Sequence, residues 1–155
     1  MIKSVWHMSF TVSDLEKSLI FYRDLLGLEV VHEQRISREY VRKIVGYPDA
    51  DLKMAMLNIP GNSVPSGHIL ELIEYVAPEG KPLDLETCNV GAGHIAFEVE
   101  DLPAVYETLK AKGVKFVSGP SAIDTGRHKG GYAVYSRDPD GVTIEFIQPQ
   151  AADVI

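Results

Sequence analysis

The sequence predicts an α+β fold of two tandem modules, each with the element order strand, helix and three further strands. Residues 7–15 match residues 94–102 at an offset of 87, with five positions identical. Residues 69–73 resemble residues 143–147 at an offset of 74. An internal repeat of this kind indicates the architecture before any single element is assigned. Each module therefore opens with a strand that contains a histidine and closes with a strand that contains a glutamate.

In the first module, residues 5–12 alternate in polarity, which is typical of a half-buried strand. Asp14 is well placed to cap a helix over residues 15–26, and Gly27 follows as its C-cap. Further strands are expected after Gly27 and near residues 53–59 and 69–76.

In the second module, Asp101 is expected to cap a helix over residues 102–112, where Pro103 is tolerated in the first turn and Gly113 ends the helix. Strands are expected near residues 113–117, 131–136 and 142–148, with a turn at residues 138–141. We place the first module at residues 1–78, a polar linker at 79–90, the second module at 91–150 and a tail at 151–155.

The composition excludes several classes of function. The chain has 155 residues and a net charge of -7, so it would repel a polyanion such as nucleic acid. It has no apolar run near the roughly 20 residues that span a bilayer, and its N-terminus lacks the apolar core of a signal peptide. We therefore expect a soluble, cytoplasmic protein. Cys88 is the only cysteine, which excludes an intrachain disulfide and a thiolate metal cluster.

Four side chains form the candidate site: His7, Glu71, His94 and Glu145. By the two-residue period of a strand, each lies on the face that its strand does not give to the helix. A carboxylate between apolar neighbours in mid-strand is costly to bury unless it is paired or binds a metal. Two imidazoles and two carboxylates suit zinc, nickel, cobalt, manganese or ferrous iron, whereas calcium prefers oxygen ligands. The sequence therefore predicts one divalent metal ion.

The ordinary role of a lone histidine or glutamate in a strand is a hydrogen-bonded or solvated one. Pairing by the repeat favours metal binding for these four. His32, His68 and His128 lack such a constellation, and the first two are expected at the surface. Residues 126–131 are either an exposed loop or a contact for an anionic substrate group.

These motifs resemble the vicinal oxygen chelate superfamily, which includes glyoxalases, epimerases, extradiol dioxygenases and bleomycin resistance proteins. The resemblance rests on His7 with residues 12–15, on residues 21–28, on residues 93–97 and on residues 138–145. It implies paired βαβββ modules that form an open, barrel-like metal cleft, usually in a homodimer. The glyoxalase and epimerase pattern implies all four residues as metal ligands.

The resemblance also implies a reaction. A small carbonyl-containing, oxygenated substrate would chelate the metal, which stabilises an enediolate, while Glu145 or Glu71 acts as the base. Two alternatives stay open: an iron-dependent extradiol dioxygenase using only His7, His94 and Glu145, and a metal-free binding protein of the resistance type. Residues 72–76 lack the Asn-Trp pair of a glutathione-specific glyoxalase, so a thiol cosubstrate is not implied.

The first module carries 13 more residues between its His and Glu strands than the second, since the spacings are 64 and 51 positions. We place this surplus segment at residues 35–51 and expect a short helix over residues 38–45. Its basic and aromatic residues suggest a functional loop that closes over the cleft and binds an anionic group; the alternative is a solvated connector. Trp6 and Tyr22 are expected to be incompletely covered, which favours a homodimer.

Overall fold

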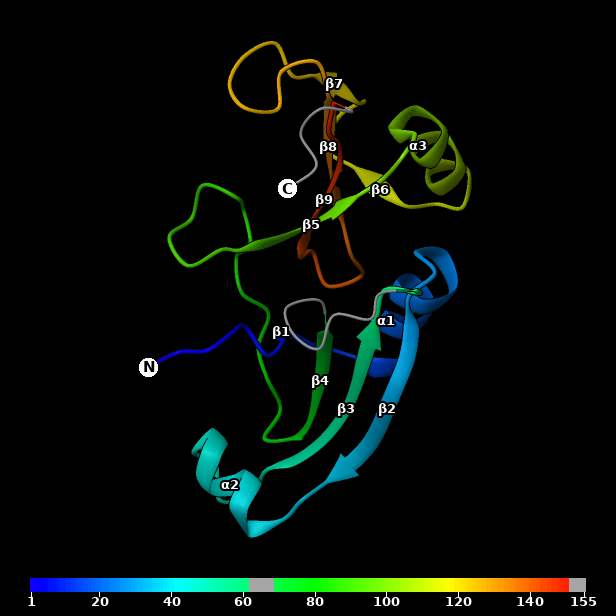
Figure 1. Ribbon diagram of the computed structural model, residues 1–155. Coiled ribbons are helices and arrows are strands. Elements are labelled where there is room, and N and C mark those ends of the chain that lie inside the picture. The colour runs from blue at the N-terminus through cyan, green and yellow to red at the C-terminus, as the bar shows by residue number, and fades with distance from the viewer. Residues whose placement is uncertain (62–68, 151–155) are drawn as a thin grey trace. The chain divides into compact units, whose positions relative to one another are not determined.

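The computed structural model describes residues 1–61 and 69–150, and these form two compact units, Met1–Pro82 and Leu83–Ile155. Each unit contains one β-sheet and few helices, as Figure 1 shows. The predicted α+β class is therefore confirmed. The predicted module and linker boundaries stay predictions, and the predicted tail at residues 151–155 lies outside the described residues.

The sheet of the first unit has the strand order β1-β4-β3-β2. β1 and β4 are parallel, whereas the β4–β3 and β3–β2 pairs are antiparallel. The parallel pair joins the two ends of the module. β1 begins at Met8, so the expectation of a strand from residue 5 that contains His7 is corrected: His7 immediately precedes β1, beside the Glu strand β4. The bounds are β1 Met8–Val12, β2 Glu29–Ile36, β3 Asp51–Asn58 and β4 Leu70–Ala77.

The sheet of the second unit repeats this arrangement with the order β5-β9-β8-β6, and β7 pairs with β8. β5 and β9 are parallel, and β8 and β9 are antiparallel. The predicted turn between β8 and β9 is present, with the Gly141 amide donating to the Asp138 carbonyl. The bounds are β5 His94–Glu98, β6 Lys115–Phe116, β7 Ser121–Ala122, β8 Tyr132–Arg137 and β9 Thr143–Gln148.

The two predicted helices begin at their predicted caps. Asp14 accepts a hydrogen bond from the Lys17 amide at 3.1 Å, and Asp101 accepts one from the Ala104 amide at 3.0 Å. α3 (Leu102–Ala111) is α-helical throughout. The first helix is not: α1 (Leu15–Leu19) continues as the π-helix η1 (Ile20–Leu25). The expectation of a regular helix over residues 15–26 is corrected accordingly.

Each sheet also holds the first residue of its helix. Glu74 of β4 accepts a hydrogen bond from the Leu15 amide at 2.8 Å, and Gln148 of β9 accepts one from the Leu102 amide at 2.8 Å. Both acceptors lie three residues after the candidate ligand of their strand. Since the first amides of a helix lack intrahelical partners, this bond fixes the helix start against the Glu strand.

The core of the first unit lies between α1, η1 and one face of the sheet, and the second unit repeats this packing with α3. Tyr22 is completely buried, so the expectation that it is incompletely covered is wrong. Trp6 is 65% exposed and Met8 is also exposed, so only the end of the first strand contributes the expected core face. The homodimer stays a prediction. The fully buried apolar residues are Leu15, Leu19, Tyr22, Leu57, Leu70, Leu72, Leu102 and Ile144.

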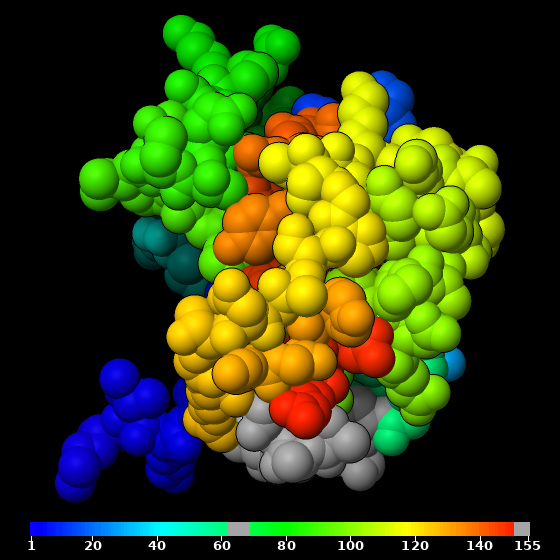
Figure 2. Space-filling model, turned by 90° about the horizontal axis from the view of Figure 1, so that it is seen from above, coloured from blue at the N-terminus to red at the C-terminus, as the bar shows by residue number. Residues whose placement is uncertain are grey.

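The surplus segment of the first unit contains the predicted helix, α2 (Glu39–Val45), which joins β2 to β3 (Figure 1). It ends at Gly46, whose φ of 79° is the left-handed conformation typical of a glycine C-cap. In the second unit, the chain between β6 and β8 is largely exposed, as its yellow to orange surface in Figure 2 shows. No helix among the described residues is long and apolar enough to cross a membrane.

Candidate functional site

The first His–Glu pair lies at the parallel strands on the edge of the first sheet: Glu71 is in β4, and His7 immediately precedes β1. Glu71 of β4 has Ser9 of β1 as its register partner, and His7 precedes Ser9 by two residues. Side chains two residues apart point to the same face, so the imidazole and the carboxylate meet diagonally across the strand pair. Nε2 of His7 lies 3.4 Å from Oε2 of Glu71. The Glu71 side chain is 10% exposed, whereas that of His7 is 33% exposed.

The second pair has the same register. Glu145 of β9 is the partner of Ala96 of β5, and His94 precedes Ala96 by two residues. Nε2 of His94 lies 3.1 Å from Oε2 of Glu145, with side-chain exposures of 44% and 16%. The sequence repeat therefore extends to the position and contact of the two candidate ligands in each unit.

The distances within the pairs fit two ligands of one ion. With metal–ligand bonds of about 2.0 to 2.2 Å, neighbouring ligand atoms stand roughly 3.0 to 3.5 Å apart in octahedral or tetrahedral geometry. Charge-assisted N–H···O hydrogen bonds are typically shorter, at about 2.7 to 2.9 Å. Nδ1 of His7 is buried and has no hydrogen-bond partner among the described residues, so Nε2 is the ring atom that meets Glu71. A donor set of one imidazole and one carboxylate per unit fits a divalent transition metal.

Each pair alone supplies two ligands. The described residues contain no group of three or more His, Cys, Asp or Glu side chains arranged to hold a metal ion. That the two pairs meet on one ion, as the four-ligand assignment requires, stays a prediction. The structure thus brings the predicted residues together as one His–Glu pair within each unit.

Each pair has a neighbour that the sequence analysis did not single out. In the first unit, Met56 of β3 is the register partner of Glu71. In the second, Tyr135 of β8 is the partner of Glu145, and its ring centroid lies 5.3 Å from that of His94. For Met56 and Tyr135, the sequence offered only strand periodicity as a signal. Which residues of β3 and β8 lie opposite the two glutamates depends on the antiparallel register, which is set by tertiary pairing.

The remaining histidines stay outside these pairs. His32 is exposed, as expected, and His68 lies outside the described residues. His128 is half-buried in the loop before β8, and its Nδ1 has no hydrogen-bond partner within the described part of the chain. Cys88 is a free, exposed thiol.

Comparison with known proteins agrees with the duplicated fold. The family model of the glyoxalase/bleomycin resistance protein/dioxygenase superfamily matches residues 4–146. The chain belongs to this superfamily. The resemblance inferred from the sequence motifs is therefore confirmed.

Two relatives indicate the chemistry found within the superfamily. A 2-epi-5-epi-valiolone epimerase from an Actinomyces species is 30% identical over 149 residues, covering 93% of this chain and 78% of the relative. A probable lactoylglutathione lyase from Vibrio parahaemolyticus is 31% identical over 157 residues, covering 96% and 92%. Both are similar to this chain over nearly its whole length.

Solved structures share the fold. A glyoxalase family protein from Bacillus cereus superimposes with a TM-score of 0.77 at 20% identity, covering 97% of both chains. Glyoxalase I from Zea mays gives a TM-score of 0.69 at 23% identity, covering 94% of this chain and 44% of that one. At these identities, the likeness concerns the fold alone.

Proposed function

We propose that the protein is a metal-dependent lyase or epimerase of the glyoxalase type that acts on a small carbonyl-containing substrate. The observation that carries this proposal is the equivalence of the two His–Glu pairs. Glu71 contacts His7 in the same register and at a similar distance as Glu145 contacts His94. This equivalence favours the four-ligand set over the three-ligand set of a dioxygenase, in which position 71 has no role.

His7, Glu71, His94 and Glu145 would hold the ion, and the ion would supply Lewis acidity to two adjacent substrate oxygens. The two imidazoles are neutral ligands and the two carboxylates balance the charge of a divalent cation. The site would therefore be electrically neutral before substrate enters, which suits a substrate that gains negative charge during the reaction.

One of the two glutamates would also act as the general base. Glu71 or Glu145 would remove the proton from the carbon next to the substrate carbonyl. Return of that proton to the neighbouring carbon gives an isomerised product, and its return to the opposite face of the same carbon gives an epimer. In both outcomes the protein neither gains nor loses a proton over the complete reaction. The name of one relative, an epimerase, corresponds to the second outcome.

The experiment measures metal and proton exchange on the same preparation. The purified chain is loaded separately with zinc, nickel, cobalt, manganese and ferrous ions, dialysed, and analysed for metal by mass spectrometry. Each form is then incubated in D2O with 2-oxoaldehydes, with and without glutathione, and with hydroxyketones. We expect about one ion per chain and deuterium at the carbon next to the carbonyl in the product.

Two results would contradict the proposal. Wild-type protein that retains no metal would eliminate the metal-dependent reaction and favour a binding protein. Oxygen consumption by the ferrous form during catechol cleavage, without deuterium exchange in any carbonyl substrate, would instead support the dioxygenase.

A further inference from the structure

The surplus segment of the first unit packs on the face of the sheet that carries Glu71. Along β4, Glu71 alternates with Leu72 and shares its face with Ile73 and Tyr75. The register partners of these three residues in β3 are Met56, Met54 and Leu52. A hydrophobic cluster joins α2 and its flanks to this same face. Its members are Val41, Ala50 and Leu52, with Ile36, Val45, Ile73 and Tyr75 packed against them.

This packing holds the surplus segment against the sheet. Ala50 is completely buried, and Val41 and Leu52 are nearly so. Three of the four basic side chains of the segment, Arg35, Arg42 and Lys43, have other partners. Arg35 donates to both carboxylate oxygens of Asp51, at 3.0 and 2.6 Å.

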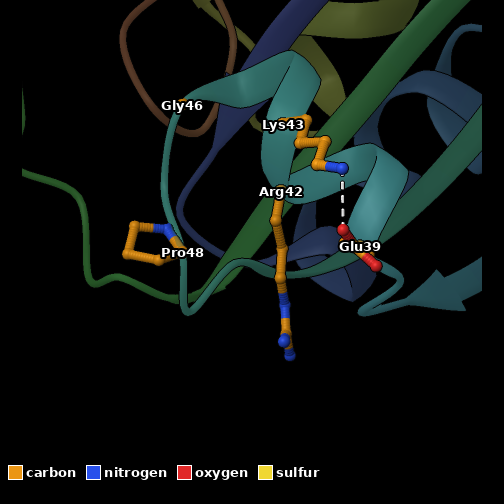
Figure 3. Close-up of a pocket in the computed structure, with 5 residues that line it drawn as sticks. All are labelled: Glu39, Arg42, Lys43, Gly46 and Pro48. Atoms are coloured by element: carbon orange, nitrogen blue, oxygen red, sulfur yellow. Dashed lines mark ion pairs between the residues drawn. The ribbon is translucent and has the colours of Figure 1, made fainter.

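The basic residues of α2 are engaged as well. Lys43 pairs with Glu39 at 2.7 Å across one helical turn, and Arg42 extends away from this pair (Figure 3). Nε of Arg42 donates to the Ala50 carbonyl at 3.4 Å. The pocket of Figure 3 is therefore lined by side chains of both charges. Its lining residues are Glu39, Arg42, Lys43, Gly46 and Pro48. These contacts favour an apolar role for the segment over recognition of an anion.

Tyr47 extends this packing beyond the C-terminal end of α2. Its ring packs edge-on against Tyr75, with centroids 6.0 Å apart and an interplanar angle of 85°. Tyr47 remains 47% exposed, so a large part of the ring is free for contact. Burial raises the pKa of Tyr75 above its ordinary value, and the nearby Tyr47 and the charge of Glu71 raise this pKa further. The influence of Glu71 on Tyr75 agrees with their position on the same face of β4.

The spacing between Glu71 and the two tyrosines determines how long a substrate must be to contact both. Residues 71 and 75 are four positions apart, or about 13 Å along a strand. Between them, Ile73 and its partner Met54 provide half-buried apolar side chains. A substrate of two or three carbons is shorter than this backbone spacing, whereas a substrate with a ring-bearing substituent is long enough to span it.

We propose that Tyr47 and Tyr75 form a specificity wall, which selects carbonyl substrates that carry an extended, ring-bearing apolar substituent. This proposal rests on the proposed function, because the metal-binding His7–Glu71 pair would hold the carbonyl end. Face and edge contacts between the tyrosines and the substituent's ring would stabilise the complex. The second unit has no segment equivalent to α2 among its described elements, so the first unit alone supplies this wall.

The test uses two chelators that differ only in the group attached to the same pair of oxygens. Acetohydroxamate carries a methyl group, and 4-phenylbenzohydroxamate carries two rings in line. Their affinities for the zinc-loaded full-length chain are measured by calorimetry, and metal content is checked after each titration. We expect both to bind, the two-ring chelator about tenfold more tightly, and Tyr47→Ala to weaken only that chelator by about fivefold.

Two matched variants make the result specific. Tyr47→Phe keeps the ring and should retain tight binding of the two-ring chelator. Tyr40→Ala removes a tyrosine from the same segment that is 57% exposed and lies outside the hydrophobic cluster, and it should change neither affinity. If Tyr47→Ala leaves both affinities unchanged, the wall is overturned while the metal centre stands. If neither chelator binds the metal-loaded protein, the metal centre fails and the wall fails with it.

Discussion

The two units share their candidate ligands but differ in what surrounds them. In both, a histidine at or just before the first strand meets a glutamate two register positions away on the parallel partner strand, and the side chain three residues after the glutamate holds the helix start. Beside the glutamate, however, the first unit places Met56 and the second places Tyr135. Among the described elements, only the first unit has a helix such as α2 and the contact between Tyr47 and Tyr75. Under the proposed function, the shared features would serve metal binding and folding, and the differing ones would serve substrate selection.

The strongest challenge to the equivalence of the two pairs is removal of one histidine at a time. His7→Ala and His94→Ala should each lower metal affinity at least tenfold, because a direct ligand matters at least as much as its supporting partners, whose loss costs about 10- to 100-fold. Metal content after dialysis against a weak chelator measures this. His32→Ala is the control, since that histidine is exposed and outside both pairs. Full metal retention in either variant would remove that histidine from the site.

The two glutamates provide a sharper comparison. Glu71→Gln and Glu145→Gln keep the side-chain shape but lose the charge and the basic group. If both are ligands and one is the base, both variants should lose metal affinity, and at saturating metal the base variant should lose about 10²- to 10⁴-fold in kcat. Glu98→Gln on β5 is the control. Unchanged metal affinity and turnover in Glu71→Gln alone would support the three-ligand alternative and end the equivalence.

The hydrogen bonds that hold the starts of the two helices should contribute similarly to stability, although one acceptor is a carboxylate and the other is an amide. Glu74→Ala removes the acceptor of the Leu15 amide and should cost about 1 to 3 kcal/mol in the free energy of unfolding. Glu74→Gln copies Gln148 of the second unit, keeps an acceptor, and should cost less than about 1 kcal/mol. Urea denaturation measures both.

A loss of stability in Glu74→Ala has a competing explanation, which is the loss of the charge of Glu74. Oε1 of this residue also pairs with Lys53 at 2.9 Å. A partly exposed pair of this kind contributes little. If Glu74→Gln were as destabilising as Glu74→Ala, that ion pair would carry the effect. Gln148→Ala then serves as the reference in the second unit, since it removes the same helix attachment without removing a charge.

The smallest expected effect concerns the ion pair that borders the surplus segment. Hydrogen bonds from Arg35 hold the pKa of Asp51 below its ordinary value. The unfolded chain should therefore bind a proton more tightly at this residue than the folded chain does. The contribution of Asp51 should be complete above about pH 4 and should disappear as the pH falls through the lower folded pKa.

Urea denaturation of wild type and Asp51→Asn across pH 2.5 to 6 measures this contribution. The difference in free energy of unfolding should shrink at the acidic end and in high salt, because the pair is exposed. Asp49→Asn, an exposed aspartate in the same segment, should show no such trend. A difference that persists unchanged at the acidic end would show that Asp51 acts through something other than its charge.

The sequence by itself determined the duplicated architecture and the two histidines and two glutamates that form the observed pairs. The repeat of residues 7–15 at 94–102 placed both histidines, and strand periodicity placed Glu71 and Glu145 on the faces away from the helices. It also located the short helix of the surplus segment, because Gly46 ends it. These features are local, since side-chain alternation and helix capping depend on neighbouring residues in the chain.

Tertiary structure decided which side chains meet across the sheets. The pairing of Glu71 with Met56, of Glu145 with Tyr135 and of Tyr47 with Tyr75 depends on strand register and on the packing of α2. A shift of one residue in register would turn the strand residues among them to the opposite face, and no local pattern specifies the register of distant strands. The burial of Tyr22 was missed for the same reason, because the surface that covers it comes from elements far apart in the chain.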